Sequence, residues 1–333
     1  MQWLKRSEFF IKKIKKKLKG GIYMLSVMTQ SFILAIMALG IYITFKLLDF
    51  PDMTADGSYT LGASVVAWSL MRGMDPILGT LIAFIAGMVA GGITGILHVK
   101  LKITNLLSGI LVMGMLYSIN LRIMGKSNVP LFTYSHLFNS NWAEKISNTL
   151  NLPVGIGKNL CYLGLALFIV ILCKLLLDLF LKTNLGYAIK GVGDNIQMVK
   201  SLGVDVGKMK ILGLMISNGL IALSGALVAQ FQGYSDVNMG VGTLVLGIAS
   251  IIIGISLFRR FRFISDTSSV IIGAFIYQSS VFYALNHGLL PTDLKLITSL
   301  ILIAFLSAGN LSLINKKLSE RINSKTKIGK KAV

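Results

Sequence analysis

The sequence predicts an all-α membrane protein with several membrane-spanning helices. Of its 333 residues, 54% are hydrophobic and only 14% are charged, and the mean hydropathy is +0.74. A soluble domain has roughly 45–50% apolar and about 25% charged residues. The apolar excess falls in long uncharged blocks, and a membrane-spanning helix needs about 20 such residues. These observations exclude a soluble globular enzyme, a disordered chain and a disulfide scaffold.

Apolar blocks follow one another along the chain, and each predicts a helix because a helix satisfies its own backbone groups in lipid. Their continuous rather than alternating apolar character disfavours a β-barrel. The blocks are 25–48, 58–71, 76–98, 103–124, 159–181, 209–230, 242–258, 267–285 and 294–309. The block at 58–71 differs from the others because it is short and begins with polar residues.

The distribution of Lys and Arg gives each block a direction. The basic gaps are 1–20, 98–102, 182–210, 259–262 and 310–333, and most loop carboxylates lie in the other gaps. Basic loops are expected in the cytoplasm. All basic gaps fall on one side only if 58–71 does not cross the membrane. We therefore predict about eight full spans plus one re-entrant or broken helix, with 25–48 running outward and both termini cytoplasmic. If 58–71 crosses, this scheme fails or another segment is re-entrant.

We expect one transmembrane domain, residues 25–310, between the basic segments 1–24 and 311–333. The formal net charge of +20 would suggest nucleic-acid binding in a soluble protein. Here the basic clusters flank membrane spans and lack interleaved aromatic residues. We expect them to orient the chain and to contact anionic lipid headgroups, without binding nucleic acid.

Two segments in different halves of the chain resemble each other. Segment 52–62 is DMTADGSYTLG, and segment 236–247 is DVNMGVGTLVLG. Interrupted apolar segments in matching positions of two halves are typical of a transport pathway. Gly and other small residues are also common in membrane helices for packing reasons alone, so both interpretations stay open.

The polar groups inside the predicted spans are almost all neutral. Carriers coupled to protons or ions keep ionisable residues in mid-membrane, so this pattern disfavours that class of transporter. Asn105, Asn120 and Asn218 are candidates for a solute pathway, although interhelical hydrogen bonding alone explains such residues. We find no G-x-x-x-x-G-K-[ST] phosphate loop, no G-x-S-x-G elbow and no histidine pair at metal-ligand spacing. We therefore expect no enzyme activity, no metal and no cofactor on this chain.

Segment 182–210 is too polar to span a membrane. It is amphipathic, with Met198, Val199 and Leu202 on one side. A short helix here can receive the force of a cytoplasmic motor or lie on the lipid surface, and its periodicity does not separate the two.

A run within this segment resembles the coupling segment of bacterial ABC-importer permeases, in the branched-chain amino acid and ribose permease superfamily. The run is T-x-x-G-x-x-x-K-x-x-G-x-N, followed by a glycine eight residues later. Its residues are Thr183, Gly186, Lys190, Gly193, Asn195 and Gly203. The family usually has Arg-Ala where this chain has Lys190-Gly191, and glycine there lowers helix propensity by about 1 kcal/mol.

Three further segments, 52–62, 213–233 and 236–247, are similar to one subfamily of these permeases. Its members pair with lipoprotein-type solute receptors, and some handle aromatic amino acids. The resemblance covers about residues 30–310. It implies a type II ABC-importer-like permease in the bacterial inner membrane. It also implies a second permease copy, two cytoplasmic ATPase subunits that carry ATP and Mg²⁺, and an external solute-binding protein.

Under this resemblance, 183–203 receives the ATPase stroke, and the loops 49–60 and 231–243 form an outer gate facing the binding protein. The candidate gate residues are Asp52, Asp56, Ser58, Asp236 and Asn238. An amino acid is the favoured solute, with a sugar, nucleoside or vitamin as alternatives. A stand-alone secondary transporter or channel for a small neutral solute is the alternative function, and a membrane scaffold without a pathway is a third.

Overall fold

The computed structural model describes residues 23–139, 141–149, 154–258 and 265–286, with isolated positions between 296 and 303. These residues are almost entirely helical, which confirms the predicted helical class. Five of the helices are long and apolar enough to cross a membrane. They are Tyr23–Leu47, Pro76–Val99 (α3), Asn105–Met124 (α4), Gly155–Leu181 within α6 (Val154–Leu181), and Val206–Gln232 (α9). Eight full spans are not confirmed, and most of the predicted span 294–309 lies outside the described residues.

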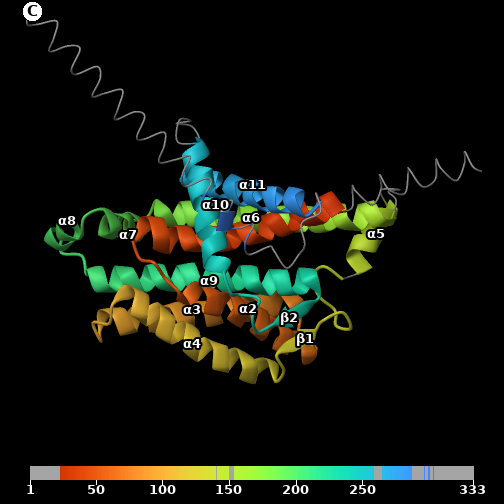
Figure 1. Cartoon of the computed structure of the whole chain (residues 1–333), viewed down its shortest axis with the longest axis horizontal. Helices are drawn as coiled ribbons and strands as arrows, with labels where there is room; N and C mark the ends of the chain where they lie inside the picture. The colour runs from red at the N-terminus through yellow and green to blue at the C-terminus, as the bar shows by residue number, and fades with distance from the viewer. Residues whose placement is uncertain are drawn as a thin grey trace, which may run out of the picture.

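The long helices lie side by side, with different structures at their two ends (Figure 1). The short helices α7 (Asn184–Asp194) and α8 (Ile196–Ser201) lie at one end, which we call the α7 end. Two short strands and α5 (Asn141–Thr149) lie at the other, which we call the ribbon end. The strands β1 (Asn128–Pro130) and β2 (Tyr234–Asp236) pair antiparallel, with Val129 opposite Ser235.

The helix α2 (Thr54–Met71) forms the middle of the bundle and is buried along most of its length. Glycines permit this burial, because a Cβ on Gly62 would lie 1.8 Å from the Ala222 carbonyl oxygen of α9. A Cβ on Gly225 of α9 would likewise lie 2.0 Å from the Tyr59 carbonyl oxygen. The predicted broken helix is therefore a helix that begins inside the bundle, four residues earlier than expected.

The helices α3 and α9 pack through a second line of glycines. Cβ atoms on Gly87 and Gly91 of α3 would lie 2.4 Å from the Asn218 carbonyl oxygen and 2.2 Å from that of Leu214, both in α9. Small residues at such spacing allow helix backbones to approach closely in membranes. The α2, α3 and α9 helices therefore form one closely packed unit.

The direction of the first helix relative to α6 differs from the predicted one. Near its start, Ser26 donates a hydrogen bond to Asn159 of α6 at the ribbon end (3.2 Å). Its last turn, the π-helical η1 (Ile43–Leu47), lies at the α7 end, where a Cβ on Gly193 would be 2.0 Å from the Leu47 carbonyl oxygen. The first helix is thus parallel to α6, whereas the charge pattern predicts the opposite. The prediction is wrong because it gave α2 no part in crossing the bundle.

The last two described helices, α10 (Thr243–Phe258) and α11 (Asp266–Asn286), pack on each other. A Cβ on Gly254 of α10 would lie 2.0 Å from the Ser269 carbonyl oxygen of α11. The chain enters α10 from β2 through a turn that passes back into the bundle beside α2. The first residues of α10, Thr243 and Leu244, are buried, so among the described helices α10 resembles α2 in beginning inside the bundle.

Candidate functional site

Asp52 lies in the interior and caps the start of α2. Its side chain is 1% exposed. One carboxylate oxygen accepts a hydrogen bond from the Thr54 backbone N–H (2.9 Å), and the other accepts one from Asn218 Nδ2 of α9 (2.7 Å). A negative charge at a helix N-terminus is stabilised by the helix dipole. Asp52 therefore joins the start of α2 to the middle of α9.

Two threonines and a glycine complete the surroundings of Asp52. The hydroxyl groups of Thr54 and Thr94 lie 2.8 Å apart, which links α2 to α3. A Cβ on Gly109 of α4 would lie 2.7 Å from the Met53 backbone nitrogen. Four helices therefore converge on the residues that precede α2.

Asp56 caps the start of α10 from a different part of the chain. Its carboxylate accepts hydrogen bonds from the backbone N–H groups of Gly242 (2.9 Å) and Leu244 (2.8 Å), and from the Thr243 hydroxyl (3.0 Å). A Cβ on Gly240 would lie 2.0 Å from the Asp56 carbonyl oxygen. The two segments that resemble each other in sequence therefore meet here, and the charge of one supports the helix start of the other.

Three buried side-chain oxygens near α2 lack a hydrogen-bond partner among the described residues: Ser58 Oγ, Asn120 Oδ1 and Asn218 Oδ1. Asn120 is anchored by its nitrogen, which donates to the Gly57 carbonyl oxygen (3.3 Å). Buried polar groups are normally satisfied by protein or water. These oxygens are therefore places where a polar group can be accepted inside the bundle.

The other predicted pathway and gate residues lie elsewhere. Asp236 accepts hydrogen bonds from Asn128 Nδ2 (3.2 Å) and from the Asn238 backbone N–H (2.8 Å), so it shapes the turn after β2 at the ribbon end. Asn105 is the first residue of α4, at the α7 end. The loops 49–60 and 231–243 meet at Asp56 and Gly242, whereas Asp236 lies at the ribbon end. The outer gate stays a prediction. The segment 49–53 starts at the α7 end, where the centre of the Phe50 ring lies 5.2 Å from the centre of the His98 ring.

The residues of the predicted coupling run each have a local structural role at α7 and α8. Thr183 caps α7 by accepting a hydrogen bond from the Gly186 N–H (3.3 Å), and Asn195 caps α8 by accepting one from the Met198 N–H (3.1 Å). Gly203 has a left-handed backbone, with φ at +72°, and ends the segment. The helix α7 continues through Gly191, so the departure from the family pattern does not interrupt it.

Close packing explains the other two glycines of the run. A Cβ on Gly186 would lie 2.4 Å from the Phe180 carbonyl oxygen at the end of α6, and Gly193 lies against Leu47 as described above. The α7–α8 unit is therefore seated on the ends of α6 and the first helix.

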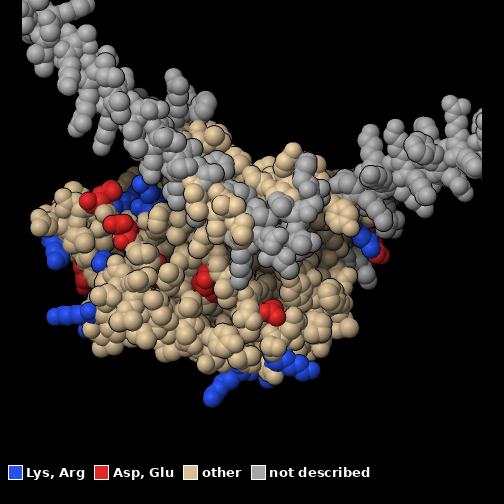
Figure 2. Space-filling view, in the orientation of Figure 1, with Lys and Arg blue, Asp and Glu red and all other residues tan. Residues whose placement is uncertain are grey.

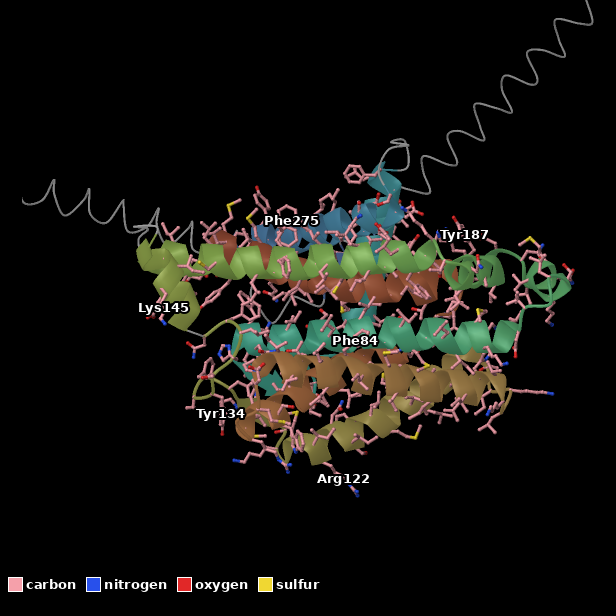
Figure 3. All side chains as sticks on the ribbon, turned by 180° about the vertical axis from the view of Figure 1, so that it is seen from behind. Phe84, Arg122, Tyr134, Lys145, Tyr187 and Phe275 are labelled. Carbon is pink, nitrogen blue, oxygen red and sulfur yellow. The ribbon has the colours of Figure 1, made fainter. Side chains whose placement is uncertain are left out.

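The α7–α8 unit exposes an apolar surface, which we call the α7–α8 patch. Its residues are Leu185, Tyr187, Ile196, Met198 and Leu202, each at least 42% exposed. Figure 3 shows Tyr187 at this end of the molecule, and Tyr134 and Lys145 at the other. Lys190 lies beside the patch, with its Nζ 5.7 Å from the Tyr187 ring centre. The predicted amphipathic side is partly wrong, because Val199 is buried while Met198 and Leu202 are exposed.

One network escaped the sequence reasoning. Asp178 of α6 accepts hydrogen bonds from Lys174 (2.7 Å) and from the Thr267 hydroxyl of α11 (2.7 Å), and Tyr42 donates to Asp266 (3.3 Å). Only the spacing of Lys174 and Asp178, four residues apart on one helix, indicated part of it. The network ties α11 to α6 and the first helix near the α7 end.

His136, in the loop after β1, is buried at the ribbon end, and this burial lowers its pKa. Its Nδ1 has no hydrogen-bond partner among the described residues. Over the same residues, no group of three His, Cys, Asp or Glu side chains is arranged to hold a metal ion.

Comparison with known proteins places these features in a family. A family model described as branched-chain amino acid transport system permease component matches residues 23–307. The tyrosine transport system permease protein of Clostridioides difficile is 62% identical over 308 residues, covering 91% of this chain and 98% of that protein. An uncharacterised Rickettsia prowazekii protein is 33% identical over 86% of this chain and 97% of its own length.

More distant relatives are also permeases. A probable branched-chain amino acid transport permease of Methanocaldococcus jannaschii is 26% identical over 67% of this chain and 70% of its own length. No solved structure matches. The chain therefore belongs to the branched-chain amino acid transport system permease family, and it is an integral membrane permease component of a transport system.

Proposed function

We propose that this chain is the membrane-spanning subunit of an ABC importer that carries an amino acid into the cytoplasm. The α7–α8 unit is the observation that carries the proposal. It is a rigidly seated pair of short helices with an exposed apolar patch, outside the long helices. Such a surface suits a cytoplasmic ATPase subunit that drives transport, with ATP and Mg²⁺ bound by that partner.

Charge supports a cytoplasmic location for the α7 end in the bacterial inner membrane. Figure 2 shows several basic side chains at this end of the visible face, together with acidic ones. Exposed lysines occur in the turns and terminal helical turns at this end: Lys100, Lys102, Lys182, Lys200 and Lys208. Basic loops favour the cytoplasmic side. Tyr23 then lies on the outer side, which does not support a cytoplasmic start for the first helix. The predicted cytoplasmic C-terminus falls outside the described residues.

We propose tyrosine or another aromatic amino acid as the first solute to test. The support is the 62% identity to a relative named as a tyrosine transport permease. An external solute-binding protein would deliver the solute at the ribbon end, and a second permease copy would complete the pathway.

The interior starts of α2 and α10 are the proposed moving parts of the pathway. Each is held by a carboxylate, Asp52 or Asp56, and the unpartnered oxygens of Ser58, Asn120 and Asn218 lie nearby along α2 and its neighbours. Interrupted helices at membrane depth are typical of solute sites in transporters. A shift of α7–α8 would reach them through α9, which directly follows the unit.

Charged substitutions in the α7–α8 patch test the proposal. We expect Met198→Glu and Leu202→Glu to abolish ATP-dependent tyrosine uptake into vesicles that contain the purified ATPase, because a charge would be buried at the contact. The matched control is Met24→Glu, since Met24 is 58% exposed and lies in the first turn of the first helix, at the ribbon end. Membrane insertion of all three variants is checked by detergent extraction and gel filtration.

The alternative function, a stand-alone transporter or channel, makes the opposite prediction. In that case vesicles holding this chain alone would take up the solute without ATP, and the Met198 and Leu202 variants would keep that uptake. Either result would remove the proposed contact with an ATPase.

A further inference from the structure

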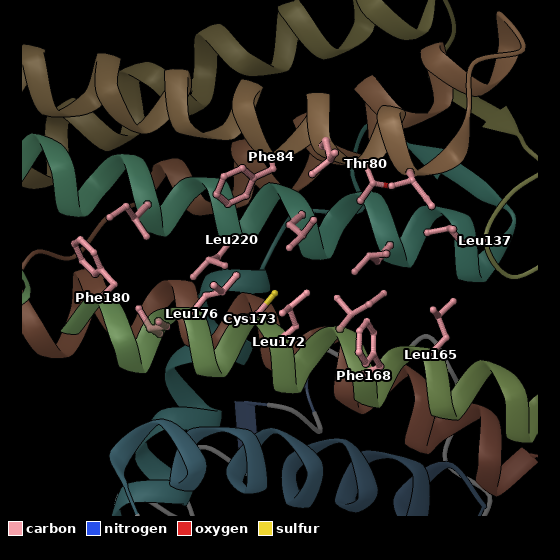
Figure 4. A pocket seen from close by; sticks show the side chains of 17 residues that line it. Thr80, Phe84, Leu137, Leu165, Phe168, Leu172, Cys173, Leu176, Phe180 and Leu220 are labelled. Carbon is pink, nitrogen blue, oxygen red and sulfur yellow. The ribbon is translucent and has the colours of Figure 1, made fainter. Parts of the chain in front are cut away.

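An apolar groove runs between α6 on one side and α3 and α9 on the other (Figure 4). It holds about 590 Å³. Phe84 and Leu220 face it from α3 and α9, and Phe168, Leu172 and Phe180 face it from α6 (Figure 4). Its floor residues are buried, while its rim on α6 is open to the side, with Phe168 63% exposed.

The groove separates α6 from the closely packed unit of α2, α3 and α9. Only 22% of the apolar window of α6 is buried, against 72% for α9. A void of this size is absent from well-packed protein interiors, because its lining atoms lose their dispersion contacts. The space therefore needs an occupant.

Polar occupants do not fit the walls of the groove. Among the described residues that line it, Thr80 alone has a side chain with a strong hydrogen-bonding group. Its hydroxyl already donates to the Pro76 carbonyl oxygen (2.7 Å) and accepts from Gln230 Nε2 (2.9 Å). A bound water needs two to four polar partners, and a zwitterionic amino acid needs partners for both charges. Neither is provided.

The dimensions of the groove suit hydrocarbon chains rather than a helix. Its α6 wall extends from Leu165 to Phe180, about 22 Å at 1.5 Å per residue. All the empty space between the walls is about 1440 Å³, so the mean cross-section is at most about 65 Å². A helix with its side chains is about 10–12 Å across and occupies roughly 80–110 Å². An alkyl chain is about 4–5 Å across, because carbon atoms contact their neighbours at about 3.5–4.0 Å.

We propose that this groove binds an acyl chain of a membrane phospholipid, which fills the space between α6 and the α3–α9 pair. The groove opens sideways at the depth of the membrane-spanning helices, where acyl chains are the surrounding medium. Lipid tails are as apolar as leucine, so the binding energy comes from closer dispersion contacts on three sides rather than from leaving water. The occupant joins two parts of the bundle that do not pack directly.

Filling the groove with protein tests the proposal. Leu172→Trp places a large side chain in the groove, and Ile171→Trp is its matched control. Both positions are 44% exposed and adjacent on α6, but Ile171 does not line the groove. Each full-length chain is purified in mild detergent with added phosphatidylglycerol, and the retained lipid is counted by native mass spectrometry. Equal thermal unfolding midpoints would show that both variants are folded.

We expect the unsubstituted chain and Ile171→Trp to retain one phospholipid per chain in the groove. For Leu172→Trp we expect the lipid-bound fraction to fall about tenfold, the change that about 1.4 kcal/mol produces. Equal retention by the two variants, or no retained lipid on the unsubstituted chain, would overturn the proposal. Loss of a dimer in Leu172→Trp with unchanged lipid would instead assign the groove to a second copy of the chain.

Discussion

At the scale of single residues, two carboxylates account for the interior starts of two helices. A helix that begins in the interior leaves backbone N–H groups without partners in its first turn. Asp52 satisfies one such group in the helix that follows it, α2. Asp56 satisfies the N–H of Leu244 in the first turn of α10 and that of Gly242 just before it, about 190 residues later in the chain. The sequence marks both as acidic residues in an apolar region, but it does not say which helix each one caps.

Replacing Asp56 by Ala removes the cap of α10. We expect a loss of about 0.5–2 kcal/mol of stability, because the Gly242 and Leu244 N–H groups lose their acceptor and the helix dipole loses its counter-charge. Thermal unfolding in detergent measures it. Asp236→Ala is the control, since the hydrogen bonds that Asp236 accepts from Asn128 Nδ2 and the Asn238 N–H are both exposed, at the ribbon end. Equal unfolding midpoints for the two variants would contradict the assigned role.

Gly62 tests the packing of α2 against α9. Gly62→Ala would put a methyl group 1.8 Å from the Ala222 carbonyl oxygen, so the two helices must separate and the yield of folded protein should fall sharply. Gly164→Ala in α6 has open space around its Cβ and should gain up to about 1 kcal/mol of helix propensity. Gel filtration after extraction compares them. A folded, stable Gly62→Ala protein would show that α2 does not lie against α9.

At the scale of elements, the α7–α8 unit is where the sequence was most informative. Most of its motif is local, because Thr183 and Asn195 cap the helices that follow them and Gly203 provides a left-handed end. Gly193 is the exception, since it packs against Leu47 far along the chain. Local chemistry of this kind can be inferred from spacing alone. The meeting of Asp56 with Gly242 cannot, since nothing in the spacing of residues 56 and 242 indicates that they are neighbours.

Asn195→Ala should loosen α8 without disturbing the bundle. The cap from Asn195 to the Met198 N–H contributes about 1 kcal/mol, and α8 has only six residues. We expect faster hydrogen exchange over 196–201, measured by mass spectrometry, with unchanged exchange in α9. Asn195→Ser keeps a capping oxygen and should restore protection. Unchanged exchange over 196–201 in the alanine variant would rule out this cap.

At the scale of the whole molecule, the direction of the first helix shows where prediction from the sequence failed. Hydropathy predicted where helices lie, and charge predicted which turns share a side. Treating each apolar block as either a full crossing or no crossing failed at 58–71. This helix begins in the interior and spans only part of the bundle. Buried Asp52 shows why hydropathy misplaced 49–57 in an outer loop, since its charge is compensated by Asn218 and the start of α2.

Cysteine labelling tests the relative direction directly. In a background with Cys161 and Cys173 replaced by Ala, single cysteines are placed at Tyr23 and Leu202, both exposed. We expect a membrane-impermeant maleimide to label Tyr23→Cys in intact cells and Leu202→Cys only after permeabilisation, because the two positions lie at opposite ends of the bundle. Labelling of both from the same side would contradict the structure.

The central claim, that the α7–α8 unit couples this permease to an ATPase, is tested most directly by co-purification. The chain is tagged, extracted gently from its native membrane, and its associated chains are identified and counted by mass spectrometry. The account predicts an ATP-binding cassette subunit at one copy per copy of this chain, lost in the Leu202→Glu variant. Purification of the intact chain alone, under conditions that preserve other membrane assemblies, would contradict it.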